Sequence, residues 1–310
     1  MGLVTITEFS AAGWGAPERA AQLAREYCER LEEGDILFFS HPPFPLPAED
    51  QAFLLEVRQT ASAVHKNIAY KPDRDRVQGY TKGSGDSEAL RRIMQSYSRS
   101  VSAFLDSFLL PYAGRWQLDF ASYRSVEEQG RDLPISKRND LLHVDSFPTR
   151  PSNGNRILRV FTNLNPERPR VWLTGEPFDA LVRAYGADAG VSRLASRARS
   201  PFHRMVRRGA RAARAIGLPV PRRPLYDEFM LGFHHYLKYN RAFQESCPKS
   251  KWEFPPNSTW LVFTDLVPHA VLSGQYAIEQ TFLVSRDALL LPEKAPCRVL
   301  EKMVNAPVVE

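Results

Sequence analysis

Three residues of this sequence could together bind a metal ion: His143, Asp145 and His269. His143 and Asp145 lie two positions apart in DLLHVDSF, a predicted strand over 140–147. Side chains at i and i+2 of a strand point to the same face, so an imidazole and a carboxylate converge there. His269 lies in a second, apolar predicted strand region over 258–274 and would face the same interior. Two histidines and one carboxylate are the set that holds Fe(II) and leaves coordination positions open.

Each part of this pattern is weak when taken alone. A His-x-Asp pair is mostly incidental, and His269 without that pair would be an ordinary core histidine. The other histidines do not offer a better set: His234 and His235 are neighbours on a predicted helix, so their side chains point about 100° apart. We expect a structural role for both. A serine hydrolase is disfavoured because the sequence has no G-x-S-x-G motif.

The elements that must position these residues fall into two kinds. Apolar residues at helical spacing predict helices over 17–33, 52–63 and 87–110. Alternating patterns predict strands over 35–40, 116–124, 140–147, 155–165, 170–175, 258–274 and 276–286, with a helical excursion over 177–247. Helices followed by short strands, without alternating βαβ units, favour an antiparallel barrel or jelly roll backed by helices.

Length and composition are consistent with one large folded domain or two small ones. The chain has 310 residues, of which 43% are hydrophobic and 25% charged, and this excludes a wholly disordered protein. The three cysteines (Cys28, Cys247, Cys297) show no C-x-x-C spacing, so we expect a reducing compartment and no disulfide framework. The N-terminus lacks the pattern of a secretory signal, and no run of 18 apolar residues occurs that could span a membrane.

The net charge of +6 is unevenly distributed. Between Val191 and Pro224 the sequence has ten arginines and no acidic residue. From Phe202 to Ile216 apolar residues recur at helical spacing among these arginines, which is typical of helices that bind an anionic membrane surface. A solvated, flexible loop is the alternative. Nucleic-acid binding is disfavoured because no aromatic platform or recognised nucleic-acid fold accompanies the charge.

The run HVDSFPTRPSNGNRILRVFTNLNPERPRVWLTG, which starts at His143, resembles the iron-binding region of Fe(II)/2-oxoglutarate-dependent dioxygenases. From the first helix to His269, basic insertion included, the chain is identified as a member of the Kdo hydroxylase family. Those bacterial enzymes hydroxylate C3 of the outer 3-deoxy-D-manno-oct-2-ulosonic acid (Kdo) of the lipopolysaccharide inner core. The resemblance implies that His143, Asp145 and His269 are Fe(II) ligands and that 2-oxoglutarate is the co-substrate.

The resemblance leaves open which arginine holds the distal carboxylate of 2-oxoglutarate. In many relatives that arginine lies roughly ten residues past the second histidine, but positions 278–281 here read Ile-Glu-Gln-Thr. The next arginine, Arg286, lies seventeen residues past His269. Arg159 and Asn163 share a face of the predicted strand over 155–165, and a buried arginine needs an anionic partner. We prefer Arg159 with Asn163 beside it and keep Arg286 as the alternative; Arg159 could equally pair with a structural carboxylate.

These expectations combine into one hypothesis. The fold class is α+β, with a double-stranded β-helix (jelly-roll) core in a single domain over 1–310. A mainly helical layer spans 1–115, jelly-roll strands span 116–176 and 255–290, and a helical, Arg-rich insertion spans 177–254. The protein would act on Kdo-lipid A as a peripheral protein at the cytoplasmic face of the inner membrane of a Gram-negative bacterium. The rival functions are a 2-oxoglutarate oxygenase with another substrate, such as a protein side chain or small metabolite, and a metal-free jelly-roll module that binds anionic lipid.

Overall fold

Two facing β-sheets form the centre of the protein in the computed structural model, which describes residues 1–57, 67–80, 86–217 and 223–309. The larger sheet has eight strands in the order β1-β4-β11-β8-β13-β7-β5-β6. Its pairs are antiparallel except β1 with β4, which are parallel. The strands are β1 (Leu3–Thr5), β4 (Ile36–Phe39), β5 (Ile68–Lys71), β6 (Arg76–Gln78), β7 (Trp116–Arg124), β8 (Arg156–Asn163), β11 (Thr259–Phe263) and β13 (Ala277–Val284).

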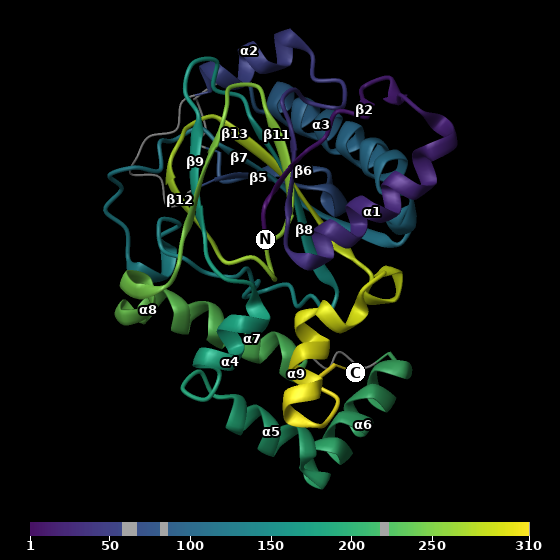
Figure 1. Ribbon diagram of the computed structural model, residues 1–310, viewed down its shortest axis with the longest axis vertical. Coiled ribbons are helices and arrows are strands. Elements are labelled where there is room, and N and C mark those ends of the chain that lie inside the picture. The colour runs from purple at the N-terminus through teal and green to yellow at the C-terminus, as the bar shows by residue number, and fades with distance from the viewer. Residues whose placement is uncertain (58–66, 81–85, 218–222, 310) are drawn as a thin grey trace.

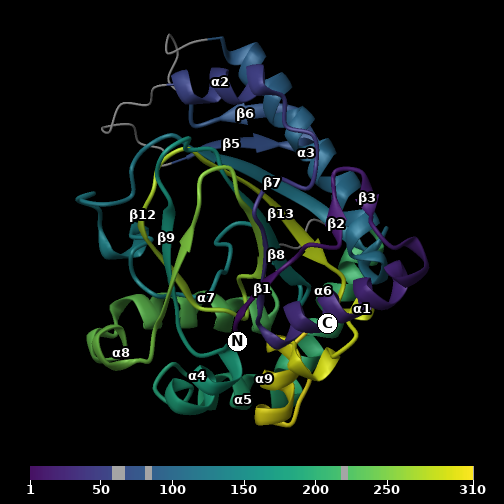
Figure 2. The same cartoon turned by 45° about the horizontal axis from the view of Figure 1, so that its top comes forward.

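The smaller sheet has three antiparallel strands in the order β10-β9-β12. They are β10 (Ser250–Phe254), β9 (Arg170–Thr174) and β12 (His269–Ser273). Trp172 at the centre of this sheet packs its ring against Phe161 and Trp260 of the larger sheet, with centroids 4.8 Å and 5.5 Å apart. In Figures 1 and 2 β9 and β12 lie on one side, facing the long strands of the larger sheet on the other.

Helices of the N-terminal part cover the outer face of the larger sheet (Figure 1). They are α1 (Ala20–Glu33), α2 (Ala48–Glu56) and α3 (Ser87–Phe108). Asp86 caps α3 by accepting hydrogen bonds from the backbone N–H groups of Glu88 and Ala89. The stripe of apolar residues from Leu90 to Phe108 is buried, because it packs on the sheet as its helical spacing predicts.

In the part of the chain that the structure describes, five helices lie between β9 and β10 in the sequence and gather at one end of the sheets with the C-terminal helix (Figure 1). They are α4 (Phe178–Tyr185), α5 (Val191–Arg199), α6 (Pro201–Ala215), α7 (Leu225–Tyr239) and α8 (Arg241–Ser246), and the C-terminal helix is α9 (Pro296–Val304). Residues 218–222 of the Arg-rich stretch lie outside the described part. No helix among the described residues is long and apolar enough to cross a membrane.

Several sequence predictions are confirmed and several are wrong. The helices predicted over 17–33 and 87–110 are α1 and α3, whereas residues 58–63 of the helix predicted over 52–63 lie outside the described residues. The region 1–115 is less purely helical than expected, because β1, β4, β5 and β6 all join the larger sheet; the small hairpin of β2 (Phe9–Ser10) and β3 (Gly13–Trp14) adds to them. The apolar run over 258–274 is two strands, β11 and β12. All three cysteines are free, in agreement with the expectation of no disulfide framework, and all three are buried.

A buried ion pair lies at the turn between β11 and β12. Arg156 donates from Nε to Asp265 Oδ2 at 2.8 Å, and both side chains are almost completely inaccessible. The Arg156 guanidinium also lies over the Phe263 ring, 4.1 Å from its centroid. Asp265 is therefore occupied by a structural partner, and its turn leads directly into His269.

Candidate active site

His143 and Asp145 lie on an irregular segment, and not on the strand predicted over 140–147, which is wrong. The segment forms one isolated antiparallel bridge, in which His143 and His269 exchange backbone hydrogen bonds of 3.2 Å and 3.0 Å. Asp145 N–H donates to the carbonyl of Thr264 at 2.8 Å. The backbone partners thus come from two places, the end of β11 and the start of β12. They hold the His-x-Asp segment directly beside His269.

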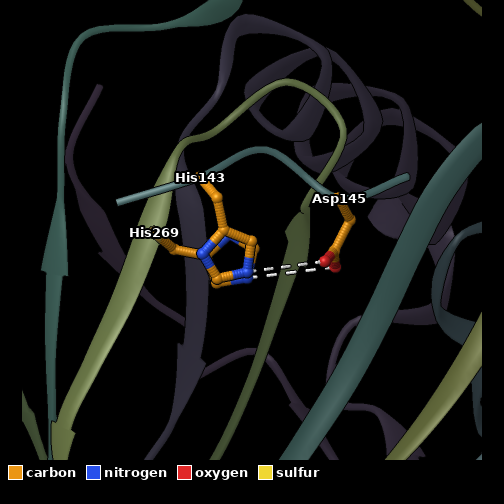
Figure 3. A group of neighbouring side chains, drawn as sticks. All are labelled: His143, Asp145 and His269. Carbon is orange, nitrogen blue, oxygen red and sulfur yellow. Dashed lines mark ion pairs between the residues drawn. The ribbon is translucent and has the colours of Figure 1, made fainter. Parts of the chain in front are cut away.

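The three side chains converge on one point (Figure 3). Asp145 Oδ1 lies 3.8 Å from His143 Nε2, and Asp145 Oδ2 lies 3.9 Å from His269 Nε2. Atoms bound to one ion at about 2.1 Å are about 3–4 Å apart, so these distances fit a shared metal ion. All three ligand atoms lie within 4.8 Å of one another. The structure therefore confirms the spatial grouping that the sequence predicted across more than a hundred residues.

The outer nitrogen of each imidazole is fixed by a backbone carbonyl. His143 Nδ1 is 2.7 Å from the carbonyl oxygen of Leu141, and His269 Nδ1 is 3.0 Å from that of Val267. A carbonyl only accepts, so Nδ1 must carry the proton and donate in both rings. This tautomer leaves the Nε2 lone pair for a metal, the arrangement that a hydrogen bond from the other ring nitrogen usually imposes on metal-binding histidines.

The protonation states also suit a cation. Burial lowers the pKa of His143 far below its usual value, and burial likewise lowers the pKa of His269. Burial alone would raise the pKa of Asp145, but the Arg159 guanidinium beside it holds that pKa well below its usual range. Metal ligands must be deprotonated. The site therefore presents two neutral imidazoles and one carboxylate.

Arg159 on β8 lies behind the carboxylate of this group. Its Nε is 3.1 Å from Asp145 Oδ2, and its Nη1 donates to Glu279 Oε1 at 3.0 Å. Glu279 also accepts from Arg124 Nη2 at 3.0 Å. Arg124 and Arg159 lower the pKa of Glu279 although its burial opposes this. Arg159 thus pairs with two carboxylates of the protein itself. Pairing with a structural carboxylate is the alternative to 2-oxoglutarate binding that the sequence left open.

His143, Asp145 and His269 line a cavity of about 750 Å³ between the two sheets. The larger sheet contributes charged residues and two phenylalanines to its wall, and the smaller sheet contributes an arginine, a tryptophan and a valine. One face of α7 and the loop over 131–150 close the remaining sides. Its lining residues include Phe120, Arg124, Arg159, Phe161, Glu279, Arg170, Trp172, Val271, Leu231, His234, His235, Lys238, Lys137 and Arg150.

Of the residues that the sequence suggested for 2-oxoglutarate, the structure brings only Arg159 to this cavity. Asn163 is buried at the end of β8, where its amide donates to the carbonyls of Arg168, Phe254 and Pro255 and ties a turn together. Arg286 lines a separate surface hollow beside Arg298. Strand β13 explains this position: it runs on from Glu279 to Val284, about 17 Å at roughly 3.3 Å per residue, and Arg286 lies beyond its end.

Sequence reasoning missed Arg170, which lines the cavity from β9. It is 1% exposed, and only its Nη1 has a hydrogen bond, to the carbonyl of Gly274 at 2.9 Å. Its Nε and Nη2 have no hydrogen-bond partner among the described residues, and Nη2 lies 3.8 Å from Glu128 Oε1. Burial, together with neighbouring Arg124, lowers the pKa of Arg170 to about 10. The sequence feature that could have revealed it is an arginine on the same strand face as Trp172 in RVWLT. An arginine on an otherwise apolar strand face is also what pointed to Arg159.

The fold and the site together define the class of a non-haem Fe(II)/2-oxoglutarate-dependent dioxygenase. Comparison with known proteins agrees. Residues 15–307 match the family described as 3-deoxy-D-manno-oct-2-ulosonic acid (Kdo) hydroxylase. The chain belongs to this Kdo hydroxylase family, and its reaction is the Fe- and α-ketoglutarate- (2-oxoglutarate-) dependent hydroxylation of Kdo.

Solved structures of the Kdo hydroxylase KdoO are similar to the whole chain. One, in complex with α-ketoglutarate and Fe(III), is 33% identical, with a TM-score of 0.80 over 100% of this chain and 98% of that chain. A second, in complex with succinate and Fe(III), is 33% identical with a TM-score of 0.80, over 99% and 97% of the two chains. The apo structure of KdoO gives the same identity and TM-score. A comparison with curated protein sequences found no significant match.

Proposed function

We propose that the protein adds a hydroxyl group to C3 of a Kdo sugar of Kdo-lipid A and so modifies the lipopolysaccharide inner core. The observation that carries this proposal is the convergence of two neutral histidines and a carboxylate at the wall of a polar cavity, in a chain of the Kdo hydroxylase family. The choice of C3 follows from the resemblance described in the sequence analysis, and the cavity is large enough for a sugar beside a small co-substrate.

In this proposal His143, Asp145 and His269 hold Fe(II). Both Nε2 atoms are available for coordination, and the Asp145 carboxylate lies 3.8 Å and 3.9 Å from them. Two neutral imidazole nitrogens and one carboxylate are the donor set that suits Fe(II). When bound, Fe(II) and 2-oxoglutarate supply, with O2, the oxidant that converts a C–H bond into C–OH. The chain itself holds the ligands, orients the substrates and limits water.

We assign the distal carboxylate of 2-oxoglutarate to Arg170 rather than to Arg159. Arg159 already pairs through Nε and Nη1 with Asp145 and Glu279. Arg170, in contrast, keeps Nε and Nη2 without hydrogen bonds, and a guanidinium can engage a carboxylate through two parallel donors. In this assignment Arg159 orients the carboxylate of the metal site and adds positive charge near the co-substrate.

The two facing sheets support a double-stranded β-helix as the core of this enzyme. In it, β8, β13 and β7 of the larger sheet face β9 and β12 of the smaller sheet, and the metal site lies between them. The helical segment between β9 and β10 is then an insertion into this core. We regard the whole chain as one catalytic domain, since α7 of the insertion lines the same cavity as both sheets.

Helix α6 supports binding to an anionic membrane surface. Its apolar side chains Phe202, Met205 and Val206 are largely exposed, and so is Ile216 one residue past its end. They recur at helical spacing, so they lie along one face of the helix, whereas the arginines of the 191–224 stretch occupy other positions. An exposed apolar stripe on a basic helix matches a peripheral membrane helix. The substrate, Kdo-lipid A, would lie in that membrane, at the cytoplasmic face of the inner membrane.

Mass spectrometry and NMR of the reacted lipid test the proposed reaction. We would incubate Kdo-lipid A with the protein, Fe(II), 2-oxoglutarate and O2, and expect one added oxygen, located at C3 of Kdo, with an equal amount of succinate. Reactions without 2-oxoglutarate or with a chelator should give no product. A hydroxyl group at another carbon would refute the C3 assignment, and succinate release without any modified lipid would point to a different substrate.

A further inference from the structure

One face of α7 forms a wall of the cavity beside the metal site. Leu231, His234, His235 and Lys238 all line the cavity, and their spacing of three and four residues places them on the same side of the helix. The His234 ring packs edge-on against the ring of His143, with centroids 4.9 Å apart, and its Nδ1 is 2.7 Å from the carbonyl oxygen of Val144. This wall is therefore in direct contact with a metal-site histidine.

Lys238 is a buried cation on this wall. Lys238 is only 5% exposed, and its Nζ donates a hydrogen bond to the carbonyl of Ser136 at 3.3 Å. An ammonium group has three donors, so this contact leaves two of them without a partner in the described part of the chain. No described carboxylate lies within ion-pair distance of Nζ. A buried ammonium group is costly unless it is paired, so this arrangement favours an anionic ligand.

Three arginines that line the cavity differ in this respect. Arg150 pairs with Asp119 at 3.1 Å, Arg159 pairs with Asp145 at 3.1 Å, and Arg124 pairs with Glu279 at 3.0 Å. These carboxylates offset the charge of the three arginines, whereas Arg170 keeps the two donors that we assigned to 2-oxoglutarate. Among the described residues, the Lys238 ammonium group has no carboxylate at such a distance.

The chemistry of the sugar supplies the missing anion. In Kdo the carboxylate is attached to C2, the carbon next to C3, so a C3–H bond held near the metal site brings the carboxylate within a few bond lengths of it. We propose that Lys238 binds the carboxylate of the substrate sugar and thereby positions C3 toward His143, Asp145 and His269. This inference rests on the proposed C3 hydroxylation. Lys238 would then be a substrate-binding residue that discriminates between Kdo and a neutral sugar.

A charge-deleted substrate tests this without altering the protein. We would compare a synthetic Kdo glycolipid with the same glycolipid carrying a carboxamide in place of the reacting sugar's carboxylate. Loss of a buried charge-assisted contact should raise KM about 30-fold or more for the carboxamide with the unaltered enzyme. Lys238→Met should raise KM for the carboxylate substrate by a similar factor. With the carboxamide, Lys238→Met should change KM by less than about threefold, because the partner is already absent.

Two comparisons separate this contact from other effects of charge. Lys137→Met removes an exposed lysine that also lines the cavity, and a change in KM of less than about threefold is expected from an exposed charge. Lys238→Arg should recover part of the lost affinity for the carboxylate substrate. The KM for 2-oxoglutarate should stay within about threefold in Lys238→Met, since Lys238 binds the sugar and not the co-substrate.

The outcomes also separate this inference from the proposed function. Equal KM values for the two substrates with the unaltered enzyme would overturn it, as would a Lys238→Met variant whose main defect is in 2-oxoglutarate binding. Either result alongside a normal C3-hydroxylated product would leave the proposed function intact. An unaltered enzyme that hydroxylates another carbon would overturn the C3 assignment, and the inference with it.

Discussion

Removal of the Arg170 guanidinium tests the assignment of the co-substrate site. Arg170→Met keeps a side chain of similar length and removes a charge that is 1% exposed and has two donors without hydrogen bonds. If those donors bind the distal carboxylate, the variant loses a buried charge-assisted pair worth about 2–5 kcal/mol. This corresponds to an increase of about 30- to 5,000-fold in the KM for 2-oxoglutarate. The loss to folding is modest: the hydrogen bond to Gly274 and the longer contact with Glu128 disappear, but Glu128 keeps its pairs with Arg124 and Arg131.

The assay is succinate release at saturating Fe(II) and Kdo substrate, measured against the concentration of 2-oxoglutarate. Arg286→Met is the matched control, since Arg286 lies outside the cavity, and its KM should not change. Gly274→Ala provides a second route: a Cβ at this position would lie 2.8 Å from Arg170 Cγ and must displace the arginine. Arg159→Met should mainly weaken Fe(II) binding through Asp145. A normal KM in Arg170→Met together with a raised KM in Arg159→Met would refute the assignment and restore Arg159.

Three other predictions follow from the same structure. His143→Ala and His269→Ala should each abolish turnover and Co(II) binding while thermal unfolding stays cooperative, whereas His41→Ala, at an exposed position, should keep both; Co(II) affinity retained in His269→Ala would remove that residue from the metal set. Asp265→Asn leaves the buried Arg156 unpaired and should lower the free energy of unfolding by about 3–5 kcal/mol in urea titrations; an unchanged value would show that the pair is dispensable. Replacing Arg204, Arg207, Arg208, Arg211 and Arg214 by glutamine should abolish sedimentation with anionic vesicles at low salt, since each arginine near such a surface contributes about 1 kcal/mol; a variant that still sediments would reduce α6 to a solvated helix.

The helices and strands that the sequence predicted correctly are those in which the repeat of apolar residues is long enough to recognise. Strands β7, β8, β9 and β13 and helices α1 and α3 each span several turns or alternations, so one buried face is visible in the residue types. Strands β1, β5, β6 and β10 were missed because they are short and lack both the continuous apolar run of β4 and the buried alternation of β9. The predicted strand over 140–147 has strand-like residues, but its backbone partners belong to two different elements, and sequence alone does not reveal this.

The residues of the site can likewise be divided into those that the sequence indicated and those that it missed. His143, Asp145 and His269 were found because a metal requires particular residue types, and this requirement holds across any distance in the sequence. Arg170 and Lys238 were missed because the cavity forms only when the smaller sheet and α7 pack against the larger sheet. Arg286 was suggested by spacing alone, and the extended backbone of β13 carries it away from the cavity. Asn163 shares a strand face with Arg159, but it lies at the strand end, where its amide serves a turn.

Tracing molecular oxygen tests the central claim, that His143, Asp145 and His269 hold the iron of a Kdo dioxygenase. The reaction would be run on Kdo-lipid A under O2 labelled with the heavy oxygen isotope, followed by mass spectrometry of both products. We predict one labelled atom in the hydroxylated Kdo and one in succinate for the unaltered enzyme, and no label in either product for His143→Ala or His269→Ala. Label that appears in succinate but not in Kdo, or a His269→Ala variant that labels both products, would contradict the account.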